Sequence, residues 1–275
     1  MSDVIVNNSG VLTNTGTYLD KIIANTLIEV AERKKHLIDL TPYPTIPRDF
    51  AAALQRETIS LIAEVKHASP SKGVLIEPFD PVDMARNYAD NGAAALSVLT
   101  DGLFFQGSLA DLRAVRAAVD LPILRKDFVI DAFQVSEARA VGADAVLLIV
   151  GVLDDARLAD LYEIVREQGL TALIEVHSEA ELDRACRLWP MPKLIGINAR
   201  DLHTFRTDLG TIRRLAVNVP ASVTLIAESG IHSAPDVQAM AEAGASAILV
   251  GESLIVAADR PAKVRELSGV KRIKH

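Results

Sequence analysis

The sequence is poor in aromatic residues and contains a single cysteine. Aromatics make up 4% of the 275 residues and hydrophobic residues 49%, so Ala, Val, Ile and Leu must fill the core. Cys186 has no partner for an intrachain disulfide, which suits a reducing, cytoplasmic location. The N-terminal residues MSDVIVNNSGVLTNTG lack the basic and apolar regions of a signal peptide. No apolar run reaches the roughly 18 residues that a membrane-spanning helix needs.

Basic residues are not in excess either, and no metal-binding pattern is present. The formal net charge is −7, which gives no electrostatic footprint for nucleic acid or for an anionic membrane. The histidines His177, His203 and His232 are scattered and lack the spacing of zinc ligands. We therefore expect a small-molecule partner, no metal, and a monomer or homodimer.

The N-terminal part of the chain divides into two segments. Residues 1–16 are rich in Asn, Ser, Thr and Gly and predict a flexible tail. Residues 17–275 predict a single catalytic domain that starts with a helix over residues 18–40, ended by the proline-rich TPYPTIP. The apolar positions of this helix fall on one side, namely Leu19, Ile22, Ile23, Leu27 and Val30.

From residue 59 onward, short β-branched runs alternate with Ala-rich amphipathic segments. Consecutive runs begin 23 to 36 residues apart, which leaves room for the helical crossover that parallel strands need. NGAAALSV, VGADAVLL and AGASAILV each place a helix-ending Gly before a strand. The expected strands are 59–66, 95–100, 122–128, 145–150, 171–176, 194–199, 224–229 and 247–251.

Eight such units predict an α/β fold, a (βα)8 TIM barrel with an extra N-terminal helix. The rival is a doubly wound open sheet, which usually has fewer strands and a Gly-rich fingerprint after the first of them. No GxGxxG motif occurs in this sequence.

Charged or polar residues lie at the ends of five predicted strands. A barrel core is packed with apolar side chains, and the carboxyl ends of its strands carry the active site. A single Glu or Lys there can be a structural ion pair, but five coincident strand ends favour a functional ring, because unpaired buried charge is unfavourable. The alternation of side chains along a strand directs Arg125 and Asp127 away from Lys126, toward structural ion pairs. The strand ends that carry these charged or polar side chains are Glu64-Val65-Lys66, Arg125-Lys126-Asp127, Glu175, Asn198 and Glu228-Ser229.

Small residues after the last two strands indicate a phosphate site. Glu228-Ser229-Gly230 and Gly251-Glu252-Ser253 expose backbone N–H groups, and phosphate sites recur at this place in such barrels. The alternative is that these glycines only make tight turns. After the first strand, SPSKG (69–73) is either a loop that holds an anionic substrate or a plain surface loop.

Taken together, IAEVKHASPSKG, LRKDFVID, ADAVLLIV, LIEVH, GINARDL, IAESGI and LVGESL resemble the indole-3-glycerol phosphate synthase family, over about residues 18–265. The resemblance implies a lyase of tryptophan biosynthesis that closes the indole ring of 1-(2-carboxyphenylamino)-1-deoxyribulose 5-phosphate, without cofactor or metal. It also implies that the extra helix packs near the barrel mouth.

The resemblance further implies roles for individual residues. Lys126 is the expected general acid and Glu175 the general base of the dehydration, while Lys66 pairs with the substrate carboxylate and can share proton transfer. Glu64 and Asn198 are expected to orient the forming hydroxyl and the catalytic lysine. The remaining expected site residues are the active-site Ser229; the substrate-binding Ser69, Phe105, Phe128, Leu147 and Arg200; and the phosphate-binding Gly230, Gly251, Glu252 and Ser253.

Two other functions remain open from the residues alone. A Schiff-base aldolase is also a barrel with a strand-borne lysine and a phosphate site, and Lys126 would then attack the carbonyl. A non-catalytic barrel that only binds a phosphometabolite would not need the opposed carboxylates Glu64 and Glu175.

Overall fold

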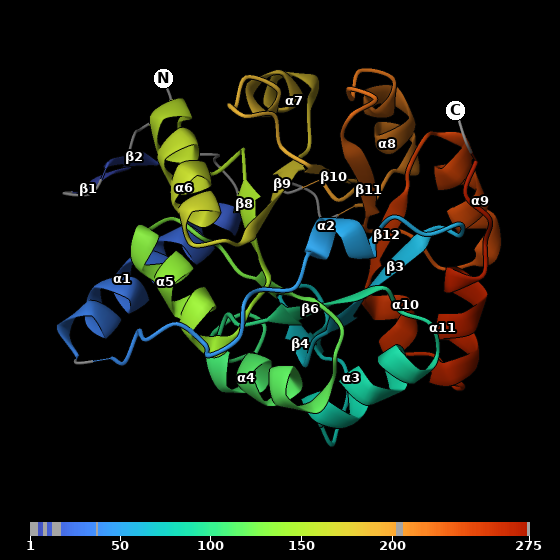
Figure 1. Ribbon diagram of the computed structural model, residues 1–275, viewed down its shortest axis with the longest axis horizontal. Coiled ribbons are helices and arrows are strands. Elements are labelled where there is room, and N and C mark those ends of the chain that lie inside the picture. The colour runs from blue at the N-terminus through green and yellow to red at the C-terminus, as the bar shows by residue number, and fades with distance from the viewer. Residues whose placement is uncertain (1–4, 8–9, 13–17, 37, 202–205, 274–275) are drawn as a thin grey trace.

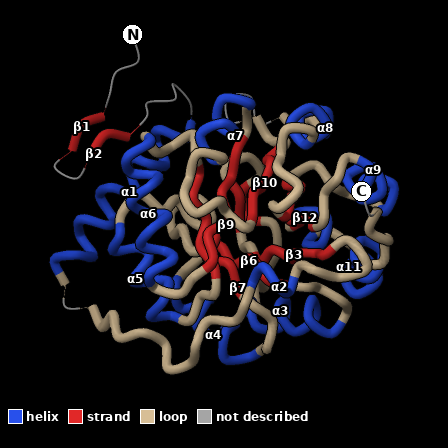
Figure 2. The backbone as a smooth tube through the Cα atoms, turned by 45° about the horizontal axis from the view of Figure 1, so that its top comes forward, coloured by secondary structure: helices blue, strands red, loops and turns tan. Residues whose placement is uncertain are grey.

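The computed structural model describes residues 5–7, 10–12, 18–36, 38–201 and 206–273. Eight parallel strands form a closed barrel in the order β10-β11-β12-β3-β6-β7-β8-β9, which confirms the predicted fold. Figure 2 shows these strands at the centre of the molecule, with helices around them. The strands are β3 (Ser60–Val65), β6 (Ala95–Leu99), β7 (Ile123–Lys126), β8 (Ala145–Ile149), β9 (Thr171–Val176), β10 (Leu194–Asn198), β11 (Thr224–Glu228) and β12 (Ala247–Val250).

Helices follow the barrel strands, and an Asp or Ser side chain caps the start of most of them. Asp80, Ser108 and Asp154, for example, accept backbone N–H groups of the first turn that have no partner within the helix. These helices are α3 (Pro81–Asp90), α4 (Leu109–Ala118), α5 (Ala132–Val141), α6 (Asp155–Glu167), α7 (Glu179–Ala185), α8 (Leu209–Ala216), α9 (Ala234–Glu242), α10 (Glu252–Ile255) and α11 (Arg260–Ser268).

The glycines that were predicted to end helices adopt the left-handed conformation. Gly92, Gly142 and Gly244 have φ values of 112°, 92° and 97°, and each directs the chain from a helix into the next strand. At Gly142 a Cβ atom would also lie 2.8 Å from Cγ of Arg116, so this position excludes a side chain on two grounds.

The N-terminal helix is shorter than predicted. Helix α1 spans Tyr18–Lys35 instead of residues 18–40. Past its end, the side chain of Asp39 accepts the backbone N–H of Thr41 at 2.9 Å, a local turn that competes with helical hydrogen bonds. Arg33 and Lys34 of α1 form ion pairs with α5, at 2.8 Å to Glu137 and 2.7 Å to Asp131, so α1 lies beside that helix (Figure 1).

Two short hairpins and one short helix were not predicted. Within the expected tail, β1 (Ile5–Asn7) and β2 (Gly10–Leu12) pair as an antiparallel ladder. The SPSKG segment forms part of a second hairpin, in which β4 (Ala68–Ser69) pairs with β5 (Gly73–Val74), so it is not a plain loop. Helix α2 (Phe50–Ala53), capped by Asp49, precedes the first barrel strand.

Arg125 lies between the barrel and the helices, as the alternation along its strand predicted. Its guanidinium is 1% exposed and contacts Asp127 at 2.7 Å and Glu137 at 3.3 Å. It also donates to the carbonyl oxygen of Gln134 at 2.6 Å, which joins β7 to α5. The charges of Arg125 and Asp127 are therefore used in structural ion pairs.

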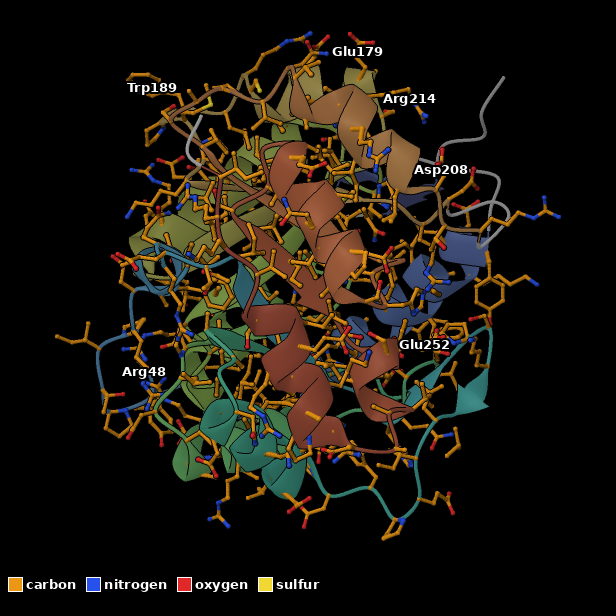
Figure 3. The ribbon with its side chains drawn as sticks, turned by 90° about the vertical axis from the view of Figure 1, so that its right-hand side faces the viewer. Arg48, Glu179, Trp189, Asp208, Arg214 and Glu252 are labelled. Carbon is orange, nitrogen blue, oxygen red and sulfur yellow. The ribbon has the colours of Figure 1, made fainter. Side chains whose placement is uncertain are left out.

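The outer surface carries isolated apolar side chains, of which Trp189 is 88% exposed (Figure 3). Among the described helices, none is long and apolar enough to cross a membrane.

Candidate active site

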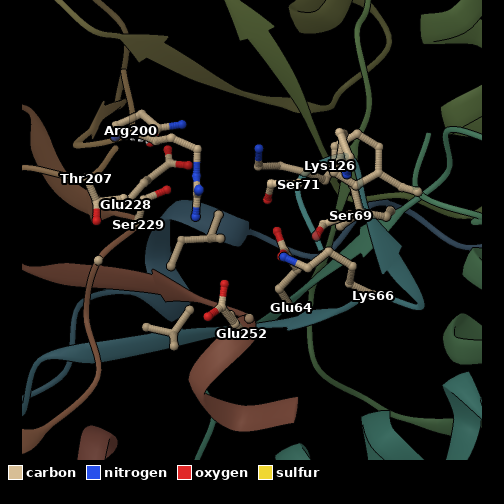
Figure 4. Close-up of a pocket in the computed structure, with 18 of the residues that line it drawn as sticks. Glu64, Lys66, Ser69, Ser71, Lys126, Arg200, Thr207, Glu228, Ser229 and Glu252 are labelled. Carbon is tan, nitrogen blue, oxygen red and sulfur yellow. Dashed lines mark hydrogen bonds and ion pairs between the residues drawn. The ribbon is translucent and has the colours of Figure 1, made fainter. Parts of the chain in front are cut away.

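A cavity of about 700 Å³ lies at the carboxyl ends of the barrel strands. Strand ends, the loops that follow them, and Tyr18, Leu19 and Ile22 of α1 form its wall, so the extra helix covers part of the mouth. Every site residue predicted from the sequence lines this cavity. Figure 4 shows Glu64, Lys66, Lys126, Glu228 and Glu252 around the same space.

Glu64 and Lys66 form an ion pair on one side of the cavity. Glu64 belongs to β3 and Lys66 follows it directly, and alternation along the strand places both side chains inward, as predicted. The ammonium of Lys66 donates to Oε1 of Glu64, and both side chains are largely buried. Such a lysine presents one cation to an incoming anion while Glu64 keeps it in place.

The space for the Glu64 carboxylate exists because position 251 is a glycine. An alanine Cβ there would lie 3.0 Å from Cδ of Glu64 and closer still to Oε1. The φ of Gly251 is −124°, outside the left-handed region that favours glycine, so we expect an alanine to act chiefly through its contact with Glu64.

Gly251→Ala is therefore expected to leave a folded protein with a displaced Glu64–Lys66 pair. A misplacement of about 1 Å at a catalytic group lowers activity by up to about a hundredfold, so kcat/KM should fall at least about tenfold. Gly102→Ala is the matched control, since its nearest neighbour would be a carbonyl oxygen at 3.9 Å. Equal kcat/KM values in the two variants would contradict this account of Gly251.

Lys126 and Glu175 form a second pair in the cavity. Nζ of Lys126 lies 3.4 Å from Oε2 of Glu175, with the side chains 17% and 3% exposed. Burial alone would lower the pKa of Lys126, but the carboxyl groups of Glu175, Glu228 and Glu64 outweigh burial and raise it. The lysine is thus held in its protonated form, which is the form that can donate a proton.

Glu175 and Glu228 interact with each other, and their surroundings move their pKa values in opposite directions. Burial raises the pKa of Glu228 well above its ordinary value, and the neighbouring charge of Glu175 raises it further. Burial also acts to raise the pKa of Glu175, but Lys126, His177 and hydrogen bonds to Glu228 and Asn198 reverse that effect and lower it. Glu175 is therefore the partner that ionises more readily, and Glu228 the one that keeps its proton more readily.

Glu228 has room because a glycine faces it from the neighbouring strand. A Cβ atom at Gly196 would lie 3.1 Å from Cδ of Glu228 and closer to Oε1. Within the described part of the chain, Oε1 of Glu228 is buried and has no hydrogen-bond partner, which disfavours the charged form of this carboxyl group.

An apolar slot occupies another part of the wall. Phe105 follows β6 and Phe128 follows β7, and their ring centroids are 6.2 Å apart. Leu147 of β8 lines the cavity beside them, with Leu19 and Ile22 of α1. An aromatic ring fits between such side chains.

The segments that follow β11 and β12 each make a turn of small residues that leaves backbone N–H groups accessible. Ser229 and Gly230 have φ values of 66° and 76°, so two consecutive residues are left-handed. The hydroxyl of Ser253 donates to the carbonyl oxygen of Ile231 at 3.0 Å, which ties the two turns together. The backbone conformation at Gly230 favours glycine, and small residues here let an anion approach the backbone.

A lysine from the SPSKG hairpin reaches across to this end of the cavity. Nζ of Lys72 lies 2.5 Å from Oε1 of Glu252. Burial would raise the pKa of Glu252, but Lys72, Arg200 and Lys66 lower it and keep the carboxylate ionised. The positive charges around Glu252 offset its negative charge, so an anion can still bind at this end of the cavity.

Comparisons with known proteins place this geometry in a family. The family model described as "Indole-3-glycerol phosphate synthase" matches residues 19–267. The chain belongs to the indole-3-glycerol phosphate synthase family. A relative of that name from Roseiflexus sp. (strain RS-1) is 52% identical over 267 residues, covering 92% of this chain and 98% of the relative. Another, from Chlorobium chlorochromatii, is 45% identical over 88% of this chain and 97% of the relative.

Solved structures of other proteins share the barrel. A 3-hexulose-6-phosphate synthase aligns with a TM-score of 0.61 at 17% identity, over 77% of this chain and 99% of that chain. An N-acetylmannosamine-6-phosphate 2-epimerase from Clostridium perfringens aligns with a TM-score of 0.58 at 16% identity, over 77% and 92%. At such identities the likeness shows the fold alone.

Sequence reasoning missed several residues of this indole-3-glycerol phosphate synthase family site. Glu228 was noticed as a charge at a strand end, but no role followed from it, and its contact with Glu175 depends on the register of β9, β10 and β11. Arg206 and Thr207 also line the cavity, from a segment with no signal in the sequence. No group of three or more potential metal ligands occurs among the described residues, and His203 lies outside them.

Proposed function

We propose that this chain converts 1-(2-carboxyphenylamino)-1-deoxyribulose 5-phosphate to indole-3-glycerol phosphate, releasing carbon dioxide and water, as a carboxy-lyase of tryptophan biosynthesis. The observation that carries the proposal is the protonated Lys126 held by Glu175 in a cavity that also contains a second lysine and an apolar slot. Family membership supports the same reaction.

The cavity offers a complementary region to each part of this substrate. Ser229, Gly230, Gly251 and Ser253 surround the place proposed for the phosphate, near Arg200 and Lys72. Phe105, Phe128 and Leu147 enclose the benzoate ring, with Ser69 at the rim. Lys66 pairs with the substrate carboxylate in exchange for part of its contact with Glu64.

Ring closure begins when the ring carbon that carries the carboxylate attacks the ketone carbon. Lys126 donates its proton to the carbonyl oxygen as the new carbon–carbon bond forms, so no alkoxide is left in the cavity. Glu64 and Asn198 hold the forming hydroxyl and the lysine in line. The carboxylate then leaves as carbon dioxide, and its bonding electrons restore the aromatic ring.

Dehydration completes the indole. The hydroxyl departs as water after it receives a proton from one of the two lysines, and Glu175 removes a proton from the carbon next to the nitrogen. The ionised state of Glu175 suits it to this task, because a base must be deprotonated before it acts. The departing oxygen receives two protons in all, and Glu175 takes one proton from carbon. The net uptake of one proton balances the negative charge of the carboxylate that leaves as neutral carbon dioxide.

A Schiff-base mechanism is the chemical alternative, and borohydride distinguishes it. In that mechanism the nitrogen of Lys126 would bond to the ketone carbon, and reduction would fix the adduct on the protein. We expect no increase in protein mass after borohydride is added during turnover. A covalent adduct on Lys126 would overturn the general-acid role.

Gly230→Asp should raise KM by at least about tenfold, since bringing like charges together at a binding site costs several kcal/mol. The matched control is Gly230→Asn, because Asn and Asp tolerate the left-handed backbone similarly and differ in charge. Dephosphorylated substrate should be equally poor with both variants. If the Asp variant had the KM of the Asn variant, the phosphate site would lie elsewhere.

The proposal extends to a cytoplasmic monomer or homodimer that acts on a free small molecule. The single cysteine supports the cytoplasmic location, and the acidic net charge of −7 supports a small molecule over a polyanion as the partner.

A further inference from the structure

A largely buried histidine, His177, lies behind Glu175 and is not among the residues that line the cavity. His177 comes directly after β9, and its side chain is 12% exposed. Its Nε2 lies 3.5 Å from Oε1 of Glu175, an ion-pair distance without a hydrogen bond among the described residues, while Oε2 of Glu175 faces Lys126. Glu175 is therefore held between Lys126 on the cavity side and His177 behind it.

The first turn of α7 fixes the orientation of this histidine. Oε2 of Glu181 accepts the backbone N–H of His177 at 2.8 Å and lies 3.3 Å from its Nδ1. The hydroxyl of Ser178 in turn accepts the backbone N–H of Glu181 at 3.3 Å. The imidazole thus has a carboxylate at each ring nitrogen.

Two carboxylates determine the protonation state of the ring. A neutral imidazole has one N–H donor and one lone pair, so its lone pair would face one of the two anions. Only the imidazolium presents an N–H group to both Glu175 and Glu181. Burial acts to lower the pKa of His177, but the contact with Glu181 and the charges of Glu175 and Glu181 raise it, against a smaller opposing effect of Lys126.

We propose that His177 is a positioning residue, an imidazolium anchored by Glu181 that aims the Glu175 carboxylate and keeps it ionised for the dehydration step. The proposal rests on the proposed function of Glu175. Three other charged or titratable groups act on His177 and Glu175: Lys126 of β7, Glu181 of α7 and Glu228 of β11. Without His177, Lys126 would be the one remaining cation among the described residues that lowers the pKa of Glu175, beside the hydrogen bonds to Glu228 and Asn198.

The test compares His177→Gln and His177→Phe with the unaltered enzyme over a range of pH. Glutamine keeps a donor without the charge, and phenylalanine keeps the bulk without either. A cation within about 4–6 Å lowers a carboxyl pKa by about 1–3 units, so the acid limb of the kcat profile should move to higher pH by at least about 1 unit in both variants. At neutral pH we expect kcat to fall about tenfold or more in the Phe variant and less in the Gln variant, since a misplaced catalytic group loses up to about a hundredfold. KM should change little, because the imidazole does not touch substrate.

Two further variants separate the possible failures. Glu181→Gln leaves His177 in place and removes its anchoring charge, so it should move the acid limb in the same direction and serves if the His177 variants do not fold. His36→Gln, at an exposed histidine remote from the cavity, should leave the profile unchanged. If Glu175→Gln lowers kcat but the His177 and Glu181 variants keep the unaltered acid limb, the positioning role is wrong and the proposed function stands. If Glu175→Gln is itself fully active, the proposed function of Glu175 fails, and the role of His177 fails with it.

Discussion

Lys126→Met should lower kcat by at least about a hundredfold, because a positioned general acid contributes about 10²–10⁴-fold in rate. Methionine has a similar length and removes both the proton and the charge. The substrate would still bind to the turns after β11 and β12, to the apolar slot and to Lys66, so its affinity should change much less. Steady-state kinetics with the carboxyphenylamino ribulose phosphate measures both constants.

Lys66→Met is the informative comparison, since the same substitution is made at the other lysine of the cavity. There the partner lost is the substrate carboxylate, so KM should rise noticeably. Lys72→Met, on the hairpin at the rim, should lower kcat less than Lys126→Met does. Near-normal kcat in the Lys126 variant would refute the acid role while leaving the fold and the phosphate site untouched.

Arg125→Met should lower the free energy of unfolding by about 3–5 kcal/mol, the range found when one partner of a buried ion pair is removed. The variant leaves the buried carboxylates of Asp127 and Glu137 without the cation between them, and the carbonyl oxygen of Gln134 without its donor. Denaturant titration monitored by circular dichroism gives this free energy.

The control is an ion pair on the surface. Arg214 lies 3.4 Å from Asp208, and both side chains are about two-thirds exposed, at 66% and 64% (Figure 3). Arg214→Met should lower the free energy of unfolding by less than about 1 kcal/mol. Equal losses in the free energy of unfolding at the two positions would mean that burial does not determine how much the ion pairs of Arg125 stabilise the fold.

Local signals in the sequence predicted the barrel and much of its mouth. The eight apolar runs and the glycines at 92, 142 and 244 act over a few residues, so they are readable without tertiary context. Alternation along β3 and β7 separated the inward Lys66 and Lys126 from the buried Arg125 for the same reason.

Features that depend on contacts between distant segments could not be read in this way. The end of α1 depends on a turn made by Asp39, and the role of Gly251 depends on a carboxylate from another strand. The link between Glu175 and Glu228 likewise requires the register of three strands. His177 looked like one of several scattered histidines until the fold brought Glu175 and Glu181 to its two nitrogens.

Turnover of 1-(2-carboxyphenylamino)-1-deoxyribulose 5-phosphate, followed by indole fluorescence and by carbon dioxide release, tests the central claim most directly. The account predicts that purified protein, in buffer that contains a metal chelator and no added cofactor, forms one indole product for each carbon dioxide released. Absence of indole fluorescence, with the substrate recovered unchanged or only bound, would contradict it.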